Sequence, residues 1–275
     1  MVETPRTLVA VATYNEIDNL PRLVDEVFRQ APQVDILVVD DNSPDGTGRW
    51  CDARALQEPR FHVLHRAAKL GLGSATRAAI RYAIDQGYTR LLTLDADFSH
   101  SPRHVPELLA RMEAADGQQA DVVIGSRYVR GGGIRGWPLG RRLMSRLLNF
   151  AARWLLDLPV RDCSGGFRCF RVATLQRVDW DAAGAQGYAF LEEMLWHLHR
   201  HGARFAEVPI QFLDRQKGRS KISFREAAAA AFTILRLGLR NRLWRRPPGH
   251  GGGANPPSAA GSPPCSRTGP LSQGE

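Results

Sequence analysis

The chain has 275 residues, of which 43% are hydrophobic and 24% are charged, and its formal net charge is +9. This composition is typical of globular proteins and excludes a fibrous or wholly disordered chain. The four cysteines form no C-x-x-C pair, which excludes a zinc ribbon and a disulfide-stapled secreted domain and favours a reducing, cytosolic compartment.

The N-terminal residues lead straight into a strand-like apolar run at 7–11, so no signal peptide is expected. No apolar run approaches the roughly 18–20 residues that a bilayer-spanning helix requires, because arginines interrupt the longest ones. We therefore expect no transmembrane helix.

Short apolar runs alternate with helix-like segments over the first 125 residues. The runs predict buried strands at 8–12, 35–39, 61–65, 90–94 and 121–125. The segments between them predict helices at 19–29, 47–56, 71–85 and 106–115. This order predicts an α/β fold with a mostly parallel sheet that is covered by helices on both faces.

Polar clusters follow three of these strands, after Ala12, Val39 and Leu94. In open parallel sheets, ligands bind outside the carboxyl ends of the strands. We therefore expect the three clusters to meet at one edge of the sheet and to form one site.

The alternation of strands and helices ends near residue 125. The sequence then predicts a basic amphipathic helix at 141–156, a helix at 190–201 and a long final helix at 224–244. Segments 165–170 and 205–212 are candidates for further strands at the edge of the sheet.

Positive charge is concentrated in two stretches, 130–153 and 236–246, which hold eleven arginines and no acidic residue. Solvated helix faces usually carry both signs, so these stretches indicate an anionic partner. A phosphorylated small molecule, a lipid surface and nucleic acid are the three candidates.

The strongest chemical signal is the pair Asp95 and Asp97, which directly follows a predicted buried strand. Two carboxylates at a strand end can bind one Mg²⁺ or Mn²⁺ ion that also contacts phosphate oxygens. Asp41, at the end of the second strand, is placed to accept hydrogen bonds from a ribose or a base. A capping role in a turn is the alternative for such aspartates. The Gly71–Gly73 segment is interpreted as a tight helix entry rather than a phosphate loop.

Several segments occur at the intervals of a known family. They are Thr13-Tyr14-Asn15-Glu16, Val38–Thr47, Leu70–Gly73 and Asp95–His100. Together they resemble the inverting family 2 glycosyltransferases, which have the Rossmann-like GT-A fold. Further segments narrow the resemblance to the polyprenol (dolichyl) phosphate mannose synthases. These are Gly125–Tyr128, Gly136-Trp137 with Arg141, Asp162–Arg168, Glu207–Ile210, Asp214-Arg215 and Ser220-Lys221.

The resemblance implies transfer of mannose from GDP-mannose to a polyprenyl or dolichyl phosphate, with inversion at the anomeric carbon. It implies that the catalytic residues are Asp97, Arg127 and Glu193, the last as a base, and that Asp95 and Asp97 bind Mg²⁺ or Mn²⁺. The residues that would bind the two substrates are Ala12, Tyr14, Glu16, Val39, Asp41, Asp95, Ala96, Asp97, Arg127, Arg141, Arg215 and Lys221. Ala12 replaces the proline that the family usually has there.

The acceptor phosphate is already anionic near pH 7, because its second pKa is about 6, so a strong general base is unnecessary. A structural role for Glu193 on a partly buried helix is therefore a second interpretation. Transfer of glucose or an amino sugar is the alternative reaction. A nucleic-acid-binding protein would lack an aromatic platform, and a nucleotidyltransferase would leave Tyr14 and Glu16 without a role.

We expect three parts in the chain. Residues 1–223 form the GT-A catalytic domain, and 224–246 form a basic amphipathic helix that associates with a membrane. Residues 247–275 contain 7 Gly, 7 Pro and 4 Ser, which predicts a disordered tail. We expect a cytoplasmic protein that is peripheral on the cytoplasmic face of the membrane, while packing of both basic helices against the protein or a separate membrane subunit stays an alternative. Nucleic acid is not an expected partner.

Overall fold

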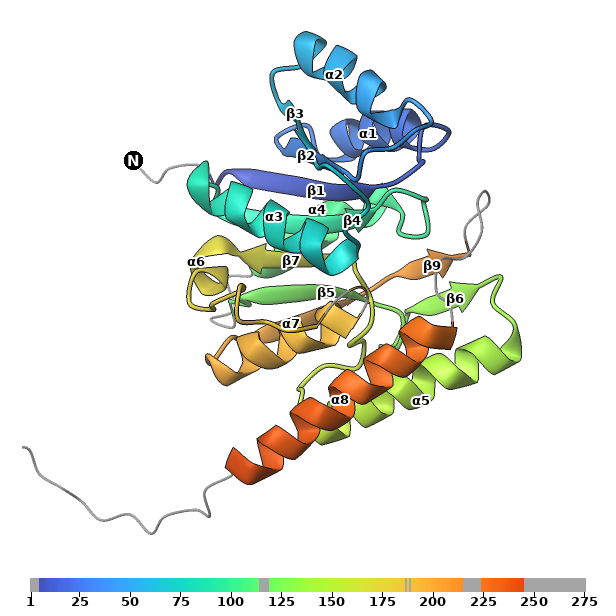
Figure 1. Ribbon diagram of the computed structural model, residues 1–275, viewed down its shortest axis with the longest axis vertical. Coiled ribbons are helices and arrows are strands. Elements are labelled where there is room, and N and C mark those ends of the chain that lie inside the picture. The colour runs from blue at the N-terminus through green and yellow to red at the C-terminus, as the bar shows by residue number, and fades with distance from the viewer. Residues whose placement is uncertain (1–4, 114–118, 186, 188, 215–223, 245–275) are drawn as a thin grey trace, which may run out of the picture.

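The computed structural model describes most of the predicted catalytic domain and the final helix (Figure 1). The described residues are 5–113, 119–185, 187, 189–214 and 224–244. The predicted tail at 247–275, Arg215 and Lys221 lie outside these residues. No helix of the described chain is long and apolar enough to cross a bilayer.

A seven-stranded sheet runs through the middle of the molecule, in the order β3-β2-β1-β4-β7-β5-β8 (Figure 1). Its strands are β1 (Thr7–Thr13), β2 (Asp35–Asp40), β3 (Phe61–His65), β4 (Arg90–Asp95), β5 (Val122–Ser126), β7 (Arg168–Arg171) and β8 (Phe205–Pro209). All neighbouring strands are parallel except β7, which is antiparallel to both β4 and β5. The prediction of a mostly parallel α/β sheet is confirmed.

Helices cover both faces of the sheet. One face packs against α1 (Leu20–Gln30), α2 (Thr47–Gln57) and α4 (Val105–Met112). The other packs against α3 (Leu72–Asp85), α5 (Leu139–Leu156), α6 (Val172–Leu175), α7 (Ala189–Arg200) and α8 (Phe224–Trp244). Strand β1 shows why two cores form. Val9 and Val11 point into one core while Leu8 and Ala10 point into the other, because side chains alternate along a strand.

The segment at 165–170 does not form an edge strand, so that prediction is wrong. Strand β7 lies inside the sheet, between β4 and β5. Its Cys169 packs into one core and its Phe170 into the other, so both faces of the strand are buried. Because β7 has only four residues, its sequence shows no periodicity that would reveal an interior position. Strand β8 is an edge strand, as expected.

Two smaller features complete the fold near the ends of the strands. A short helical turn, η1 (Pro102–His104), precedes α4. Strands β6 (Gly133–Arg135) and β9 (Gln211–Leu213) form a separate parallel pair beside α5. Helices α5 and α8 lie side by side (Figure 1), and α8 also packs against α7.

Candidate active site

A polar cleft lies at the carboxyl ends of β1, β2 and β4, where the three polar clusters were expected to meet. It is lined by Ala12, Thr13, Tyr14, Glu16, Asp41, Lys69, Gly71, Leu72, Ala75, Asp95, Ala96, Asp97 and Gly187. Seven of the thirteen are predicted site residues, and they come from three separate strand ends. We call this cavity the polar cleft.

Each of these three strands is followed by a non-glycine residue in the left-handed backbone region. They are Asn15 after β1, Asn42 after β2 and Phe98 after β4, with φ of 59°, 57° and 59°. Asparagine adopts this conformation readily, but a bulky residue such as Phe98 does so at a cost of roughly 1–2 kcal/mol. The turn that carries Asp97 is therefore held in a strained shape by its surroundings.

The loops at the cleft are joined by aspartates whose roles are structural. Asp40 accepts hydrogen bonds from the hydroxyls of Thr13 (2.8 Å) and Ser43 (2.6 Å), which ties β1 to β2. Asp45 accepts the backbone N–H groups of Ile17 (3.1 Å) and Thr47 (3.0 Å). These contacts fix the first two strand-end loops relative to each other.

Asp41 and Lys69 connect the cleft to the start of α3. Asp41 accepts the backbone N–H groups of Leu70 (3.1 Å) and Gly71 (3.3 Å) and forms an ion pair with Arg66. Lys69 lies over the ring of Tyr14, with its Nζ 4.3 Å from the ring centroid. Sequence reasoning missed Lys69, whose only signal was its place just before the predicted Leu70–Gly73 segment.

Asp95 and Asp97 are brought together at the end of β4, with their carboxylates in the polar cleft. Asp95 Oδ2 lies 3.2 Å from His100 Nδ1, and Asp97 Oδ1 accepts the backbone N–H of Ser99 (3.0 Å). Within the described chain, no cluster of three or more His, Cys, Asp or Glu side chains could hold a metal ion. Two carboxylates suit Mg²⁺ or Mn²⁺, which bind oxygen and leave positions for substrate.

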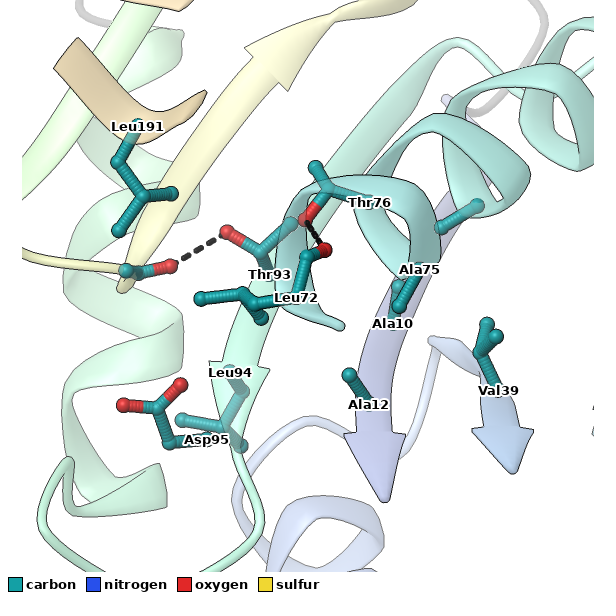
Figure 2. Close-up of a pocket in the computed structure, with 12 residues that line it drawn as sticks. Ala10, Ala12, Val39, Leu72, Ala75, Thr76, Thr93, Leu94, Asp95 and Leu191 are labelled. Carbon is teal, nitrogen blue, oxygen red and sulfur yellow. Dashed lines mark hydrogen bonds between the residues drawn. The ribbon is translucent and has the colours of Figure 1, made fainter. Parts of the chain in front are cut away.

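A small pocket that Asp95 helps to line lies between the sheet and α3 (Figure 2). Small side chains, Ala10 and Ala12 on β1 and Ala75 on α3, leave this space open. Val39 lines this pocket rather than the polar cleft. Thr93 Oγ1 donates a hydrogen bond to the Gly166 carbonyl (2.6 Å), one of the two dashed contacts in Figure 2. That bond joins the end of β4 to the segment before β7.

A second, larger cavity opens between α5, α8 and the β6–β9 pair. It has an empty volume of about 970 Å³ and is lined mainly by apolar side chains. They include Leu72, Trp137, Met144, Leu148, Leu191, Phe212 and Ala230, together with the polar residues Asp95, Arg127, Arg141, Ser145 and Glu192. We call it the apolar cleft. Asp95 and Leu72 line both clefts, so the two cavities meet there.

Arg127 is held rigidly at the apolar cleft by a buried ion pair with Asp162. Two parallel hydrogen bonds of 2.7 Å join the guanidinium to the carboxylate, and Asp162 also accepts the Arg127 backbone N–H (2.9 Å). Burial lowers the pKa of Arg127, but the charge of Asp162 and the hydrogen bonds raise it by more. Arg127 is therefore always charged, and the negative charge of Asp162 offsets its positive charge.

Arg141 is the second guanidinium in the apolar cleft. It lies 4.0 Å above the ring of Trp137 and is 3.4 Å from Asp214. Unlike Arg127 it is only partly buried, so it has room to move toward a ligand. The cleft thus combines an apolar wall with two guanidinium groups, each of which is paired with an aspartate.

Glu193 and its neighbour Glu192 are both buried on α7 but have different surroundings. Glu193 accepts hydrogen bonds from the Ala185 N–H (2.7 Å) and from Arg236 (3.3 Å), and it lines neither cleft. Glu192 lines the apolar cleft, and its Oε2 has no hydrogen-bond partner among the described residues. Burial raises the pKa of Glu192 to about 7, although the charge of Arg168 opposes this. Sequence reasoning singled out Glu193 and missed Glu192.

Comparison with known sequences gives consistent matches. The model of the family "Glycosyl transferase family 2" matches residues 8–179. The chain is 43% identical to a polyprenol monophosphomannose synthase of Mycolicibacterium smegmatis, covering 88% of this chain and 90% of that protein. It is 42% identical to an undecaprenyl-phosphate mannosyltransferase of Micrococcus luteus, covering 86% of this chain and 96% of that protein.

Solved structures share the fold at low sequence identity. Glucosyl-3-phosphoglycerate synthase from Mycobacterium tuberculosis, in a complex with Mn²⁺ and UDP, has a TM-score of 0.60 at 21% identity, over 86% of this chain and 80% of that one. A mannosyltransferase from Pyrobaculum calidifontis, in complex with GDP-Man and Mn²⁺, has a TM-score of 0.57 at 18% identity, over 87% and 65%. The fold is therefore that of the GT-A glycosyltransferases. By its sequence, the chain belongs to glycosyl transferase family 2.

Proposed function

We propose that the protein transfers mannose from GDP-mannose to a polyprenyl phosphate, with inversion, and so produces polyprenyl-phosphate β-mannose. The observation that carries this proposal is that the polar and apolar clefts meet at Asp95. A nucleotide sugar suits the polar cleft and a lipid suits the apolar one, so their reactive ends would meet at the junction. The 43% and 42% identity to two polyprenyl-phosphate mannosyltransferases supports the same substrates.

The donor would bind in the polar cleft at the ends of β1, β2 and β4. Tyr14 and Glu16 line the cleft beside Asp41, where they are placed to contact the guanosine. Asp95 and Asp97 would hold Mg²⁺ or Mn²⁺, which supplies Lewis-acid stabilisation to the departing nucleoside diphosphate. The Lys69 ammonium adds a positive charge to the polar cleft, next to the ring of Tyr14. These residues keep the diphosphate in one orientation.

The acceptor phosphate would lie in the apolar cleft, near Arg127 and Arg141. Their charges reduce the repulsion between two anions that must come within bonding distance. Arg215 and Lys221, outside the described residues, remain proposed phosphate contacts. The acceptor oxygen attacks as an anion and needs no strong base. The contacts of Glu193 with Ala185 and Arg236 support a positioning role for it rather than proton transfer.

The isoprenoid chain requires contact with a membrane surface, and α5 and α8 suit that contact. Both helices carry large exposed apolar side chains: Leu139, Leu143, Leu147, Phe150 and Trp154 on α5, and Phe232, Leu235 and Leu239 on α8. We call the five α5 residues the apolar stripe. Met144 and Leu148 of α5 and Ala230 of α8 line the apolar cleft, so this surface adjoins the cleft. We propose peripheral attachment to the cytoplasmic face of the membrane through these two helices.

The proposal is tested by product analysis in detergent. The purified chain, radiolabelled GDP-mannose, a short polyprenyl phosphate and Mg²⁺ or Mn²⁺ should give a β-linked mannosyl lipid, and UDP-glucose should give little product. Asp97→Asn should lower turnover about 10²–10³-fold, because a preorganised charge at the leaving group is lost. Asp179→Asn, an exposed aspartate away from both clefts, is the matched control and should stay active. A faster reaction with UDP-glucose would overturn the donor assignment.

A further inference from the structure

A further cavity, which is lined by several arginines, lies beside α5 and is separate from the apolar cleft. Four exposed arginines converge on it from three segments: Arg130 follows β5, Arg146 and Arg153 lie on α5, and Arg161 follows α5. The cavity is open to solvent, and none of the described residues that line it carries a carboxylate. We call it the arginine pocket.

The four exposed arginines of this pocket form no ion pair with the described residues around them. In the described part of the chain, none of these four arginines forms an ion pair with a carboxylate. Glu207 lies nearby, but its carboxylate accepts the backbone N–H groups of Arg161 (2.9 Å) and Asp162 (3.0 Å). Four guanidinium groups that line one open cavity without a carboxylate ion pair favour a bound anion.

The arginine pocket lies on a different flank of α5 from the apolar cleft. The α5 residues that line the pocket are Arg146, Asn149, Phe150 and Arg153. Those that line the apolar cleft are Arg141, Met144, Ser145 and Leu148, with the same spacing but five positions earlier. Five positions correspond to a rotation of about 140° around a helix that turns about 100° per residue. Of the residues that the structure describes, Arg127 alone, which is paired with Asp162, lines both cavities.

The pocket is continuous with the apolar stripe. Phe150 lines the pocket and belongs to the stripe, and Leu147 and Trp154 lie next to it along the same exposed face of α5. A ligand that carries a phosphate on an apolar body fits both surfaces at once. A soluble phosphate compound without an apolar part would leave the apolar rim in water.

We propose that the arginine pocket binds the phosphate headgroup of an anionic membrane phospholipid, at a position distinct from the acceptor cleft. The inference rests on the membrane attachment proposed above. Guanidinium groups suit this role because they bind phosphate oxygens through paired N–H donors. A lipid held there would fix the orientation of the protein on the membrane. The apolar stripe would lie in the leaflet, and the apolar cleft would lie at the surface of the leaflet.

The test is partition of the full chain onto phosphatidylcholine vesicles with and without phosphatidylglycerol. The triple variant Arg146→Gln, Arg153→Gln, Arg161→Gln should lose about a hundredfold in binding to the anionic vesicles, because each basic residue near such a surface contributes about fivefold. The matched control removes three exposed arginines elsewhere, by Arg49→Gln, Arg103→Gln and Arg177→Gln. It should lose far less. Both variants should keep their transfer activity in detergent with a short acceptor.

Three results would overturn the inference. Equal losses in the two triple variants would mean a diffuse charge effect without a pocket. A loss of detergent activity in the first variant would assign the arginines to the acceptor site. Binding of inorganic phosphate by the wild type, without any preference for anionic vesicles, would assign the pocket to a soluble anion. Failure of the proposed reaction is distinguishable, because the wild type would then make no mannosyl lipid while vesicle partition could still be measured.

Discussion

At the scale of single residues, the adjacent glutamates of α7 show how helix phase decides a role. Successive residues of a helix point about 100° apart, so neighbouring side chains can have different surroundings. Glu193 points toward Ala185 and Arg236, and Glu192 points into the cleft. Burial disfavours the charged form of Glu192 by more than a backbone hydrogen bond and the charge of Arg168 favour it, which is why its pKa is raised to about 7.

This pKa makes a testable prediction about stability. The ordinary pKa of a glutamate is 4.5, so the folded protein, with Glu192 near 7, binds the proton more tightly than the unfolded chain. The resulting stabilisation is complete below pH 4.5 and is lost as the pH rises toward 7. Glu192→Gln has no charge to bury, so its free energy of unfolding relative to the wild type should rise by up to about 3 kcal/mol over that range. Urea unfolding at several pH values measures this difference, and a constant difference would contradict it.

The site residues that could be identified from the sequence are those whose position follows from the neighbouring strand. Tyr14, Asp41 and Asp95 follow directly after apolar strands, and the carboxyl ends of parallel strands meet at one edge. Lys69 and Glu192 could not be identified in this way. Their positions in the clefts depend on the path of a loop and on the rotation of α7 against the sheet, which no short motif encodes.

At the scale of elements, α3 and α7 pack closely beside the polar cleft. Gly73, the second residue of α3, lies so near α7 that an added Cβ would be 2.8 Å from the Cβ of Phe190 and 3.3 Å from the carbonyl oxygen of Gly187. Gly187 lines the polar cleft, so this contact also sets one wall of the proposed donor site. The absent side chain at position 73 thus determines how closely the two helices approach.

Gly73→Ala should therefore lower the free energy of unfolding by about 1–3 kcal/mol, because overpacking forces α3 and α7 apart. Gly140→Ala is the matched control. Gly140 is also the second residue of its helix, α5, but no atom lies within 4 Å of an added Cβ there. Its substitution should leave stability unchanged or raise it by up to about 1 kcal/mol. Chemical denaturation compares the two, and equal effects would argue against the close packing.

The order of elements was predictable because each strand of the first half is a compact apolar run and each helix has its own periodicity. The interior position of β7 was not. Residues 168–171 pair with β4 and β5, which lie far away in the sequence, and nothing local distinguishes an interior from an edge strand of four residues. Such pairing is decided by tertiary packing, which overrides local pattern.

At the scale of the whole molecule, α5 and α8 lie side by side (Figure 1), and both helices expose large apolar side chains. Isolated exposed apolar residues are common on proteins, but a continuous stripe over an 18-residue helix is not. The proposed attachment explains both the stripe and the arginines around it. It also implies that the donor reaches the polar cleft from the aqueous side.

The double variant Leu143→Ser, Leu147→Ser should weaken partition onto neutral vesicles by at least about tenfold, because burial of each leucine contributes about 1.5–3 kcal/mol. Leu56→Ser is the control, since Leu56 on α2 is 90% exposed and remote from the stripe. Both proteins should retain wild-type activity toward a short acceptor in detergent. Unchanged vesicle binding in the double variant would show that the stripe does not enter the leaflet.

The place of β7 in the sheet has a consequence for the catalytic cycle. The strands that carry the polar cleft, β1, β2 and β4, lie on one side of β7, while β5, which leads to Arg127, lies on the other. In the described sheet, the two sides are joined across this four-residue strand. Donor and acceptor bound together would contact both sides of the sheet, and would so hold the two sides in a fixed relative position.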